Sequence, residues 1–443
     1  MKVRVVFVLL CLFYVEGYTQ NRYFNLDSCI QYALRHRPEI GISENSGRQI
    51  TLETDYLRKR QLPDLNASYA HQFSWGRSLN MEKYEWEDDK NRFGSMSLSS
   101  GITLFAGLKL RYQLQAAKLS LERNNSAHQK LQNDIRLEVI QCYYELQAAQ
   151  ATLELYRLFY DKDCNWEERM KVLYCAGRLA EPDWEDCRTQ TLKSVTALRN
   201  AEKLYSIALL KLKKNIHYTS ADSLILLSSD QQKPVWIPSV EMMYSQAISS
   251  LPEIKLRKCD SLLLDNRARQ LRSNFYPVLS LSGTLYSRYQ NNATDPFKDS
   301  GYSPWKQIRD NNYKQVGISF SLPLFNRGEV RYNIRLLEIE KMNLKISADK
   351  LLADIRYEIE QIWLEAQTRK QNCELLEKQE QSFYKIYHLR QVQYEKHKLT
   401  LYDLFIAESN WKNARQELLI ERFNLDCYLE MINFYLNNNP NLR

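Results

Sequence analysis

The sequence contains little glycine and proline for its length. Its 443 residues include 12 glycines and 11 prolines, which are confined to a few windows. Between Gly107 and Pro234 the only interruption is the segment 177–183, and the run from Leu108 to Ala176 is free of both amino acids. Because glycine and proline end helices, this pattern predicts a very long helical hairpin that turns at 177–183. Residues 329–439 also lack both amino acids, so a second hairpin is expected there.

Long apolar runs are also absent after the first twenty residues, so no transmembrane helix is expected beyond that point. Any membrane contact should therefore be made by strands. Residues 1–20 combine Lys2 and Arg4, an apolar core of about a dozen residues and a polar end, which predicts a secretory signal peptide. Cys11 lies inside that core without small residues before it, which disfavours the alternative of a lipoprotein cysteine.

The chain lacks the spacings that carry catalytic or metal chemistry. It has no phosphate loop, no catalytic triad and no C-x-x-C pair, so we expect no enzyme activity, no metal site and no cofactor. Cys175 and Cys187 flank the first turn, but packed helix axes stand about 8–10 Å apart, so free thiols are favoured over a disulfide. A net charge of +8 is small for this length and does not indicate nucleic acid as a partner. The six histidines are dispersed: His36, His71, His128, His217, His388 and His397.

Two segments of the first half alternate apolar residues with serine, glycine and other small or polar residues, which is typical of strands with one apolar face. The serine-rich face suits a water-filled interior better than a packed core. The first repeat, 21–239, is thus expected to contain a helix over 26–60, strands at about 64–76 and 93–105 separated by a polar loop over 77–92, a long helix 108–176, the tip 177–183, a return helix to about 216 and an irregular segment 217–239.

The second half repeats the first. Pro38 and Pro63 correspond to Pro252 and Pro277 at an offset of 214, and residues 131–150 match residues 351–370 at eight of twenty positions with an offset of 220. This agreement indicates an internal duplication. The second repeat, 240–443, is expected to contain a helix 240–273, strands at about 278–290 and 313–325, a long helix 329–396, the tip 397–403 and a C-terminal helix to about 436.

The second tip is located by the offset of 220 alone, because it contains neither glycine nor proline. Gly177 corresponds to His397, and Asp183 corresponds to Asp403. Four amphipathic strands cannot cross a bilayer as an open sheet, since its edges would expose unpaired backbone groups to lipid. Closed membrane barrels need about eight or more strands, so several copies must contribute, and three copies would give twelve. The long charged helices must then project into the periplasm.

Six motifs occur along the mature chain: Leu26-Asp27-Ser28-Cys29-Ile30, Arg37-Pro38-Glu39-Ile40, Pro63-Asp64-Leu65, Tyr276-Pro277, Pro323-Leu324-Phe325-Asn326-Arg327-Gly328 and the tip pattern Tyr174-x-x-Gly177-x-Leu179-x-x-x-Asp183. Through these motifs the chain resembles the TolC family of outer-membrane efflux proteins over essentially its whole mature length. The resemblance implies a mostly α-helical homotrimer with a 12-stranded membrane β-barrel and a coiled-coil-like α-helical tunnel. It also implies an outer-membrane location in a Gram-negative bacterium, contact with lipid, and tips that dock onto a periplasmic adaptor and an inner-membrane transporter.

The resemblance assigns two roles to the tips. Asp403 is expected to form the acidic constriction of the tunnel, with Asp183 as the second candidate, whereas the alternative for both is that they only cap the returning helices. The sequence departs from the family at His397, which replaces a glycine, at Leu399, where some members carry a basic gating residue, and at Ile406, where some carry a second aspartate. The residues expected to dock the adaptor are Tyr174, Gly177, Arg178, Leu179, Tyr394, His397, Lys398 and Leu399.

The leading functional hypothesis is a passive exit duct for small molecules that is energised by an inner-membrane pump. A second hypothesis within the same class is the export of a protein or peptide through a type I system. A coiled-coil scaffold protein is the alternative from another class, since heptads are often only structural seams.

Overall fold

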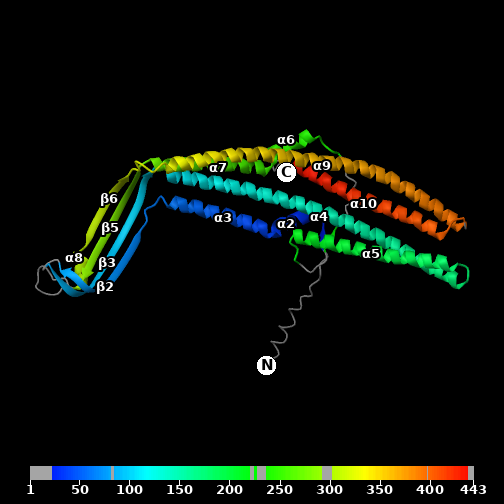
Figure 1. Cartoon of the computed structure of the whole chain (residues 1–443), viewed down its shortest axis with the longest axis horizontal. Helices are drawn as coiled ribbons and strands as arrows, with labels where there is room; N and C mark the ends of the chain where they lie inside the picture. Colours follow the sequence, from blue (N-terminus) through cyan, green and yellow to red (C-terminus); the bar gives the residue numbers. More distant parts are fainter. Residues whose placement is uncertain are drawn as a thin grey trace, which may run out of the picture. The chain divides into compact units, whose positions relative to one another are not determined.

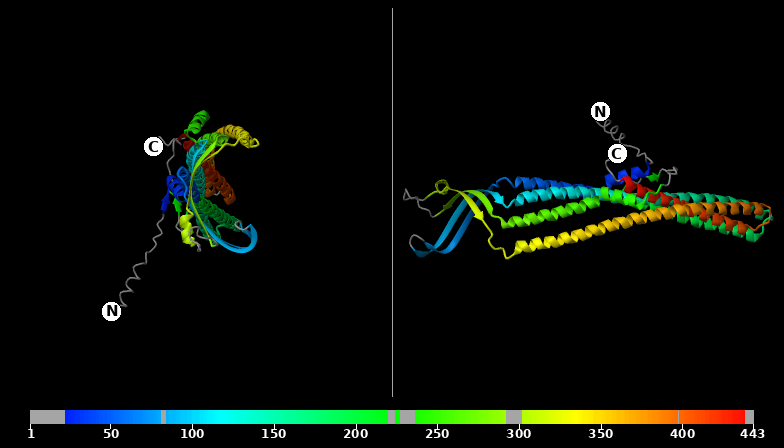
Figure 2. Two further views of the ribbon diagram at one scale, coloured as in Figure 1. Left: turned by 90° about the vertical axis from the view of Figure 1, so that its left-hand side faces the viewer. Right: turned by 90° about the horizontal axis from the view of Figure 1, so that it is seen from above.

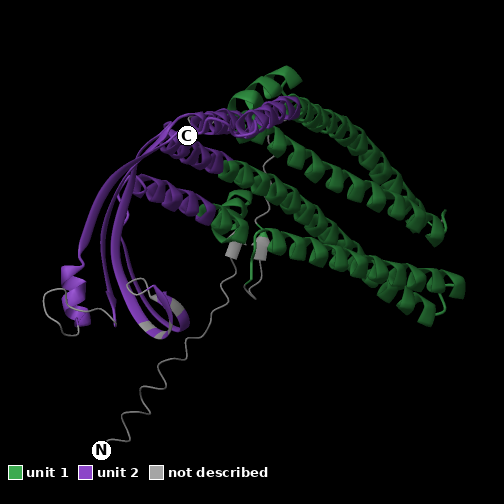
Figure 3. Ribbon diagram, turned by 60° about the vertical axis from the view of Figure 1, so that its left-hand side comes forward, with its two compact units in different colours: residues 1–44, 127–254, 349–443 green, residues 45–126, 255–348 purple. Residues whose placement is uncertain are grey.

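The computed structural model describes residues 22–80, 84–219, 224–226, 236–291, 302–396 and 398–437. The expected signal peptide and His397 lie outside these residues. The chain divides into two compact units, which Figure 3 shows in separate colours. Unit 1 comprises residues 1–44, 127–254 and 349–443, and unit 2 comprises residues 45–126 and 255–348. The units therefore do not coincide with the two repeats, because each repeat contributes its strands to one unit and most of its long helices to the other.

Unit 2 contains a four-stranded antiparallel sheet. Its strands are β2 (Asn66–Asn80), β3 (Glu85–Ala106), β5 (Val278–Gln290) and β6 (Tyr313–Ser321), in the order β2-β3-β5-β6. Figure 2 shows the four strands side by side and bending together. The central β3–β5 pair joins the two repeats, so one continuous sheet is built from both halves of the duplication.

The prediction of a polar loop over 77–92 is wrong. Apart from residues 81–84, this segment extends β2 and β3, which pair from Asn66 with Ser99 as far as Asn80 with Glu85. Charged side chains did not prevent pairing, because the backbone ladder needs only N–H and C=O groups and Arg77 stands opposite Asp88. The charge-rich segment 85–92 therefore belongs to β3 and not to a loop.

The strand expected over 313–325 is shorter than predicted, since β6 ends at Ser321. Pro323 follows two residues later and cannot donate to a ladder. The connection between β5 and β6 contains a helix that the sequence analysis did not predict, α8 (Pro304–Asp310), capped by Ser303. The amide of Gln307 donates to the Gln290 carbonyl at 2.8 Å and accepts from the Gln290 N–H at 2.9 Å, so α8 completes the edge of β5 where β6 is absent.

The two helices predicted over 26–60 and 240–273 are each broken at a proline. The first consists of α2 (Leu26–His36) and α3 (Pro38–Lys59), and the second of α6 (Val240–Ser250) and α7 (Pro252–Arg272), which is followed by the short 3-10 helix η2 (Ser273–Phe275). The residues before the prolines, Arg37 and Leu251, are extended, with ψ of 128° and 130°. Proline disfavours the helical conformation of the preceding residue, and the two breaks lie at equivalent positions of the two repeats.

Unit 1 contains the turns of two helical hairpins and the helix segments next to these turns. The first hairpin pairs α4 (Lys109–Cys175) with α5 (Glu181–Asn215), and the second pairs α9 (Glu329–Glu395) with α10 (Leu401–Asn437), as Figure 1 shows. Helices α4 and α9 each have 67 residues, about 100 Å at about 1.5 Å per residue. Within the segment 217–239, β4 (Leu224–Leu226) pairs in parallel with β1 (Arg22–Phe24), a small sheet that was not predicted.

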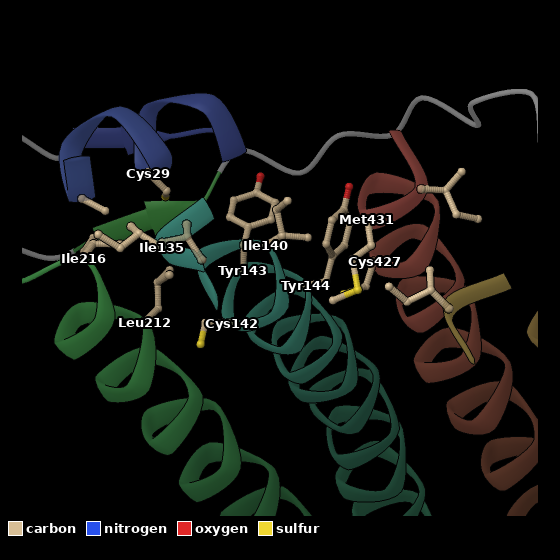
Figure 4. Close-up of a cluster of buried hydrophobic side chains, with 14 of the residues drawn as sticks. Cys29, Ile135, Ile140, Cys142, Tyr143, Tyr144, Leu212, Ile216, Cys427 and Met431 are labelled. Carbon is tan, nitrogen blue, oxygen red and sulfur yellow. The ribbon is translucent and has the colours of Figure 1, made fainter. Parts of the chain in front are cut away.

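The core of unit 1 lies along one face of α4. Its residues Ile135, Val139, Cys142 and Leu146 recur at spacings of four and three and are all buried, and the Cys142 sulfur accepts a hydrogen bond from the Asn215 side-chain amide at 2.8 Å. Figure 4 shows Tyr144 lying beside Met431 and Cys427 of α10, while Leu212 and Ile216 of α5 gather near Ile135. The eight cysteines in the described ranges are free thiols, including Cys175, which is exposed, and Cys187, which is buried.

None of the helices in the described ranges carries an apolar stretch long enough to cross a membrane. Within the same ranges, no group of three or more histidine, cysteine or acidic side chains is placed to hold a metal ion.

Candidate functional site

The first tip is a helix end closed by glycine. Gly177 has φ of +68°, a region that side-chain-bearing residues rarely adopt. Its N–H donates to the Tyr174 carbonyl at 2.9 Å, and the N–H of Arg178 donates to the Leu173 carbonyl at 2.9 Å. This pair of bonds is the Schellman pattern that satisfies the last carbonyls of α4. A Cβ atom on Gly177 would meet nothing within 4 Å, so the glycine serves the backbone conformation and not the surrounding space.

The second tip makes one of these two hydrogen bonds at the expected offset. The N–H of Lys398 donates to the Gln393 carbonyl at 2.9 Å, which is the counterpart in the second repeat of the Arg178–Leu173 bond. Helix α10 begins at Leu401, and the corresponding residue Glu181 begins α5. The predicted tip 397–403 therefore falls at the turn between α9 and α10, although His397 itself lies outside the described residues.

The two return helices begin with different caps. Ala180 is the N-cap of α5 and makes no side-chain bond, with Pro182 in the first turn. At the start of α10, the Thr400 hydroxyl accepts from the Asp403 N–H at 3.2 Å and donates to the Asp403 carboxylate at 2.6 Å. Asp403 is thus part of a cap, as in the alternative considered for it. Asp183 is half-buried in the first turn of α5, where the helix N-terminus favours negative charge.

The tips of both hairpins pack into one apolar cluster, called the tip cluster below. Its buried residues come from all four helices and are Met170, Cys187, Tyr387, Leu401, Leu404, Phe405 and Ala407. Leu179 and Tyr394 pack against it. The Tyr394 hydroxyl lies 3.8 Å from the Met170 sulfur, and its ring lies 5.7 Å from that of Trp166. Burial, and to a lesser extent the nearby charge of Asp183, raise the pKa of Tyr394.

The structure separates the residues predicted to dock a partner into a group that packs inward and a group that is open to solvent. Leu179 and Tyr394 face the tip cluster, and the Tyr174 ring stacks at 6.0 Å on that of Trp184. Gly177, Arg178 and Lys398 are exposed, and Leu399 is half-buried. Part of the predicted set thus holds the two tips together, and the other part is open to solvent in this chain.

A cluster of buried polar side chains, which the sequence did not predict, connects the two hairpins near the tips. Its charged members are Lys162, Asp163, Glu408 and Lys412, and it is called the polar cluster below. Lys162 of α4 forms an ion pair with Glu408 of α10 at 2.7 Å and donates to the Tyr387 hydroxyl of α9 at 2.6 Å. Its neighbour Asp163 is 3% exposed and accepts hydrogen bonds from Ser194 and Gln190 of α5. The spacing of four and three that relates the buried residues of α4 from Ile135 to Leu146 reaches Asp163 when it is continued along the helix. A charged residue at a position that this spacing predicts to be buried was the available signal.

Burial governs the protonation of this polar cluster. It raises the pKa of the Glu408 carboxyl, although the charge of Lys162 opposes the shift. It also raises the pKa of Asp163, which the hydrogen bond from Ser194 partly offsets. Burial lowers the pKa of Lys412, whose ammonium lies 5.4 Å from the Tyr156 ring centroid. Two acids and two lysines thus share a poorly solvated site, so the loss of any one leaves its partner's charge uncompensated.

A groove of about 620 Å³ lies next to this polar cluster, between α4 and α9. Phe159, Tyr384 and Trp411 provide its aromatic lining, and the Trp411 ring N–H donates to the Glu380 carboxylate at 2.9 Å. Lys162 and Arg415 supply positive charge at the same groove. This part of unit 1 therefore offers an aromatic surface with charges of both signs.

The sequence profile of the family described as "Outer membrane efflux protein" matches residues 29–216 and 243–426, which is well over half of the chain. The two matched segments correspond to the two repeats. No curated protein sequence was found to match the chain.

Solved structures similar to this chain include three bacterial outer membrane proteins. The CmeC outer membrane channel of Campylobacter jejuni aligns with a TM-score of 0.76 at 17% identity, covering 93% of this chain and 85% of that one. VceC from Vibrio cholerae aligns with a TM-score of 0.69 at 17% identity, covering 92% and 95%. The open state of MtrE from Neisseria gonorrhoeae aligns with a TM-score of 0.72 at 14% identity, covering 93% and 88%. At these identities the likeness is one of fold.

Proposed function

Because the chain belongs to the outer membrane efflux protein family, we propose that it is the passive exit duct of a tripartite system, through which an inner-membrane pump expels small molecules by way of a periplasmic adaptor. The protein lies in the outer membrane, with its helices in the periplasm. The observation that carries the proposal is the joint position of two hairpin tips on one apolar cluster, at the end of helices about 100 Å long. Such a length reaches far beyond a bilayer toward a partner.

The sheet supports a trimer. Strands β2 and β6 are its two edges, and an edge exposed to lipid leaves backbone groups without partners. Three copies of the four strands close a barrel of twelve, whose apolar outer face contacts lipid and whose serine-rich inner face lines water. The structures described as outer membrane channels share this fold, so the same assembly is proposed here.

The tips are proposed to combine docking and closure. Exposed Arg178 and Lys398, with Tyr174, Gly177, His397 and Leu399, form the surface offered to the adaptor, while Leu179 and Tyr394 position the two tips. Asp403 is proposed to narrow the tunnel, because three symmetry copies of a carboxylate near an axis bind cations or repel one another. Asp183 is the second candidate for the same role.

The test of the constriction is single-channel conductance of the reconstituted trimer with and without divalent cations. Asp403→Ala is expected to raise conductance and to abolish the effect of divalent cations. Because this substitution also removes the partner of Thr400, the matched control is Thr400→Ala, which loses the cap and keeps the carboxylate. If both variants behave alike, or if neither differs from wild type, Asp403 does not form the constriction.

Three further measurements test the tips and separate the alternatives. Gly177→Trp and Leu399→Asp are expected to abolish export while leaving a membrane-inserted trimer, and loss of insertion would instead assign these residues to folding. Capture of the inner-membrane partner by affinity purification distinguishes a drug pump from a type I secretion transporter. A mature protein that fractionates as soluble and forms no heat-modifiable trimer would support the scaffold alternative.

A further inference from the structure

One face of the sheet carries an apolar band, which Lys314 of β6 interrupts next to Leu285. The strand register places Leu279, Leu281 and Leu285 of β5 in pairs with Phe320, Ile318 and Lys314 of β6, so these side chains share a face. On the other side of β5, Leu281 and Leu285 pair with Ile102 and Leu98 of β3. From Leu279 to Tyr289 the strand rises about 33 Å at about 3.3 Å per residue. With a tilt of about 40° this gives about 25 Å, the height of an outer-membrane apolar band.

A hydrogen-bonded aromatic cluster marks the far end of this band. The Tyr289 hydroxyl lies 2.9 Å from the Tyr69 hydroxyl and 2.9 Å from His71 Nδ1. The Tyr289 ring also covers Gly94, where a Cβ atom would stand only 2.3 Å from the ring. Side chains with an apolar body and a polar tip collect at the boundary between hydrocarbon and headgroups. The cluster therefore marks the level at which the sheet leaves the outer leaflet.

Beyond this cluster the same face of the β2–β3 hairpin becomes cationic and aromatic. Phe73 pairs with Arg92 one step further out, and Trp75 pairs with Lys90 in the next step. The Arg92 guanidinium lies 5.5 Å from the Phe73 ring centroid, and Trp75 is 78% exposed. Arg92 and Lys90 lie two and four residues beyond Gly94. At the same tilt they are therefore about 5 and 10 Å further than Gly94 along the membrane normal. That interval is where lipid headgroups begin.

We propose that Arg92 and Lys90, flanked by Phe73 and Trp75, bind the phosphate groups of a phosphorylated lipid of the outer leaflet. Guanidinium and ammonium groups form charge-assisted hydrogen bonds with phosphate oxygens, and the exposed rings pack against the upper acyl chains or the sugar. One step further out, Arg77 stands opposite Asp88 in the register, so an acidic residue shares the outer end of this face with the cations. The inference rests on the lipid contact proposed above for this face.

The test compares retention of two lipids by the full-length trimer. Protein is reconstituted into phosphatidylcholine nanodiscs containing a minor share of either diphosphorylated lipid A or the same lipid after removal of its phosphates, then extracted in mild detergent. Native mass spectrometry counts the lipid A bound per trimer. Wild type is expected to retain the diphosphorylated form and to lose the dephosphorylated one. Lys90→Gln with Arg92→Gln is expected to retain roughly thirtyfold less, as for the loss of two cations at an anionic surface.

The matched control is Arg288→Gln, which removes one positive charge from β5 beside Tyr289 but on the opposite face of the sheet. Its retention of lipid should equal that of wild type. Equal retention by the double variant, an equal loss in the control, or equal retention of both lipids would overturn the inference. A protein that does not enter nanodiscs at all would instead contradict the proposed membrane contact of the sheet. All three substituted side chains are exposed, and a heat-modifiable trimer on a gel verifies the fold of each variant.

Discussion

The first tip turns at a glycine with φ of +68°, whereas the sequence of the second tip contains no glycine, and both ends make the same hydrogen bond at equivalent positions of the two repeats. The first return helix starts at Ala180 without a side-chain cap, and the second starts with the Thr400–Asp403 pair. The packing of two long helices therefore fixes the position of the turn, and the side chains around the turn can differ between the two tips. Equivalent positions at the two tips can therefore carry different roles.

The two hairpins also differ in the charged residues next to the tips. Glu408 of α10 corresponds to Arg188 of α5 at the offset of 220, yet Glu408 pairs with Lys162 in a buried site and Arg188 forms an exposed pair with Glu185 at 3.5 Å. Lys162 and Asp163 likewise correspond to Ser382 and Phe383. The charges of the polar cluster are therefore not duplicated, and the two hairpins of one protomer are no longer interchangeable.

The largest expected effect comes from breaking the buried pair. Glu408→Ala should lower the free energy of unfolding by about 3–5 kcal/mol, because it leaves the Lys162 ammonium in a poorly solvated site. The equivalent change in the first repeat, Arg188→Ala, removes an exposed pair and should change stability by less than about 1 kcal/mol. Thermal unfolding of the detergent-solubilised trimer, followed by circular dichroism, measures both. Equal effects of the two substitutions would contradict the asymmetry of the hairpins.

The next largest effect is expected at Gly177, because glycine is required there only for the backbone conformation and not for lack of space. Gly177→Ala places a side chain in the left-handed region and should destabilise the first hairpin by about 1–2 kcal/mol. Gly41 also has open space around it but lies inside α3 without a positive φ, so Gly41→Ala should stabilise the protein by about 0.5–1 kcal/mol. Hydrogen exchange at the end of α4 and in α3 would report these opposite signs. The same sign at both sites would argue against the role given to Gly177.

These comparisons show how far the sequence determined the structure. The hairpins followed from the scarcity of glycine and proline, and the second tip followed from the repeat register, since helices at a fixed offset must end at equivalent places. The breaks at Pro38 and Pro252 were readable by the same physical rule. They were missed because the surrounding residues favour helix on both sides.

Other features depended on contacts between distant residues. The ladder between Arg77 and Asp88 joins segments that each look like polar loop, so only pairing identifies them as strand. The polar cluster brings together residues from four helices, and no local pattern shows that Lys162 meets Glu408. Leu179 and Tyr394 were predicted to dock a partner, but the sequence did not reveal that they pack inward against the tip cluster.

The caps provide a smaller, reciprocal test. Thr400→Ala removes the hydroxyl that bonds both the N–H and the carboxylate of Asp403 and should destabilise the start of α10 by about 1 kcal/mol. Ala180 has the extended conformation of an N-cap, with φ of −72° and ψ of 149°. Ala180→Thr should therefore stabilise the start of α5 by about 0.5–1 kcal/mol. Hydrogen exchange of the first-turn amides measures the two changes, and an unaffected α10 would show that the cap does not contribute.

The smallest effect concerns the pH dependence of the polar cluster. Burial raises the pKa of Glu408 above its unfolded value, so the folded protein binds more protons than the unfolded protein between these two values. The contribution of Glu408 to stability is therefore largest below its ordinary pKa and decreases as the pH rises through the raised pKa. Glu408→Gln does not titrate, so the stability of wild type relative to this variant should increase as the pH falls across that window. Arg188→Gln in the first repeat should show no such trend, and a wild-type advantage that grows toward higher pH would contradict the sign of the shift.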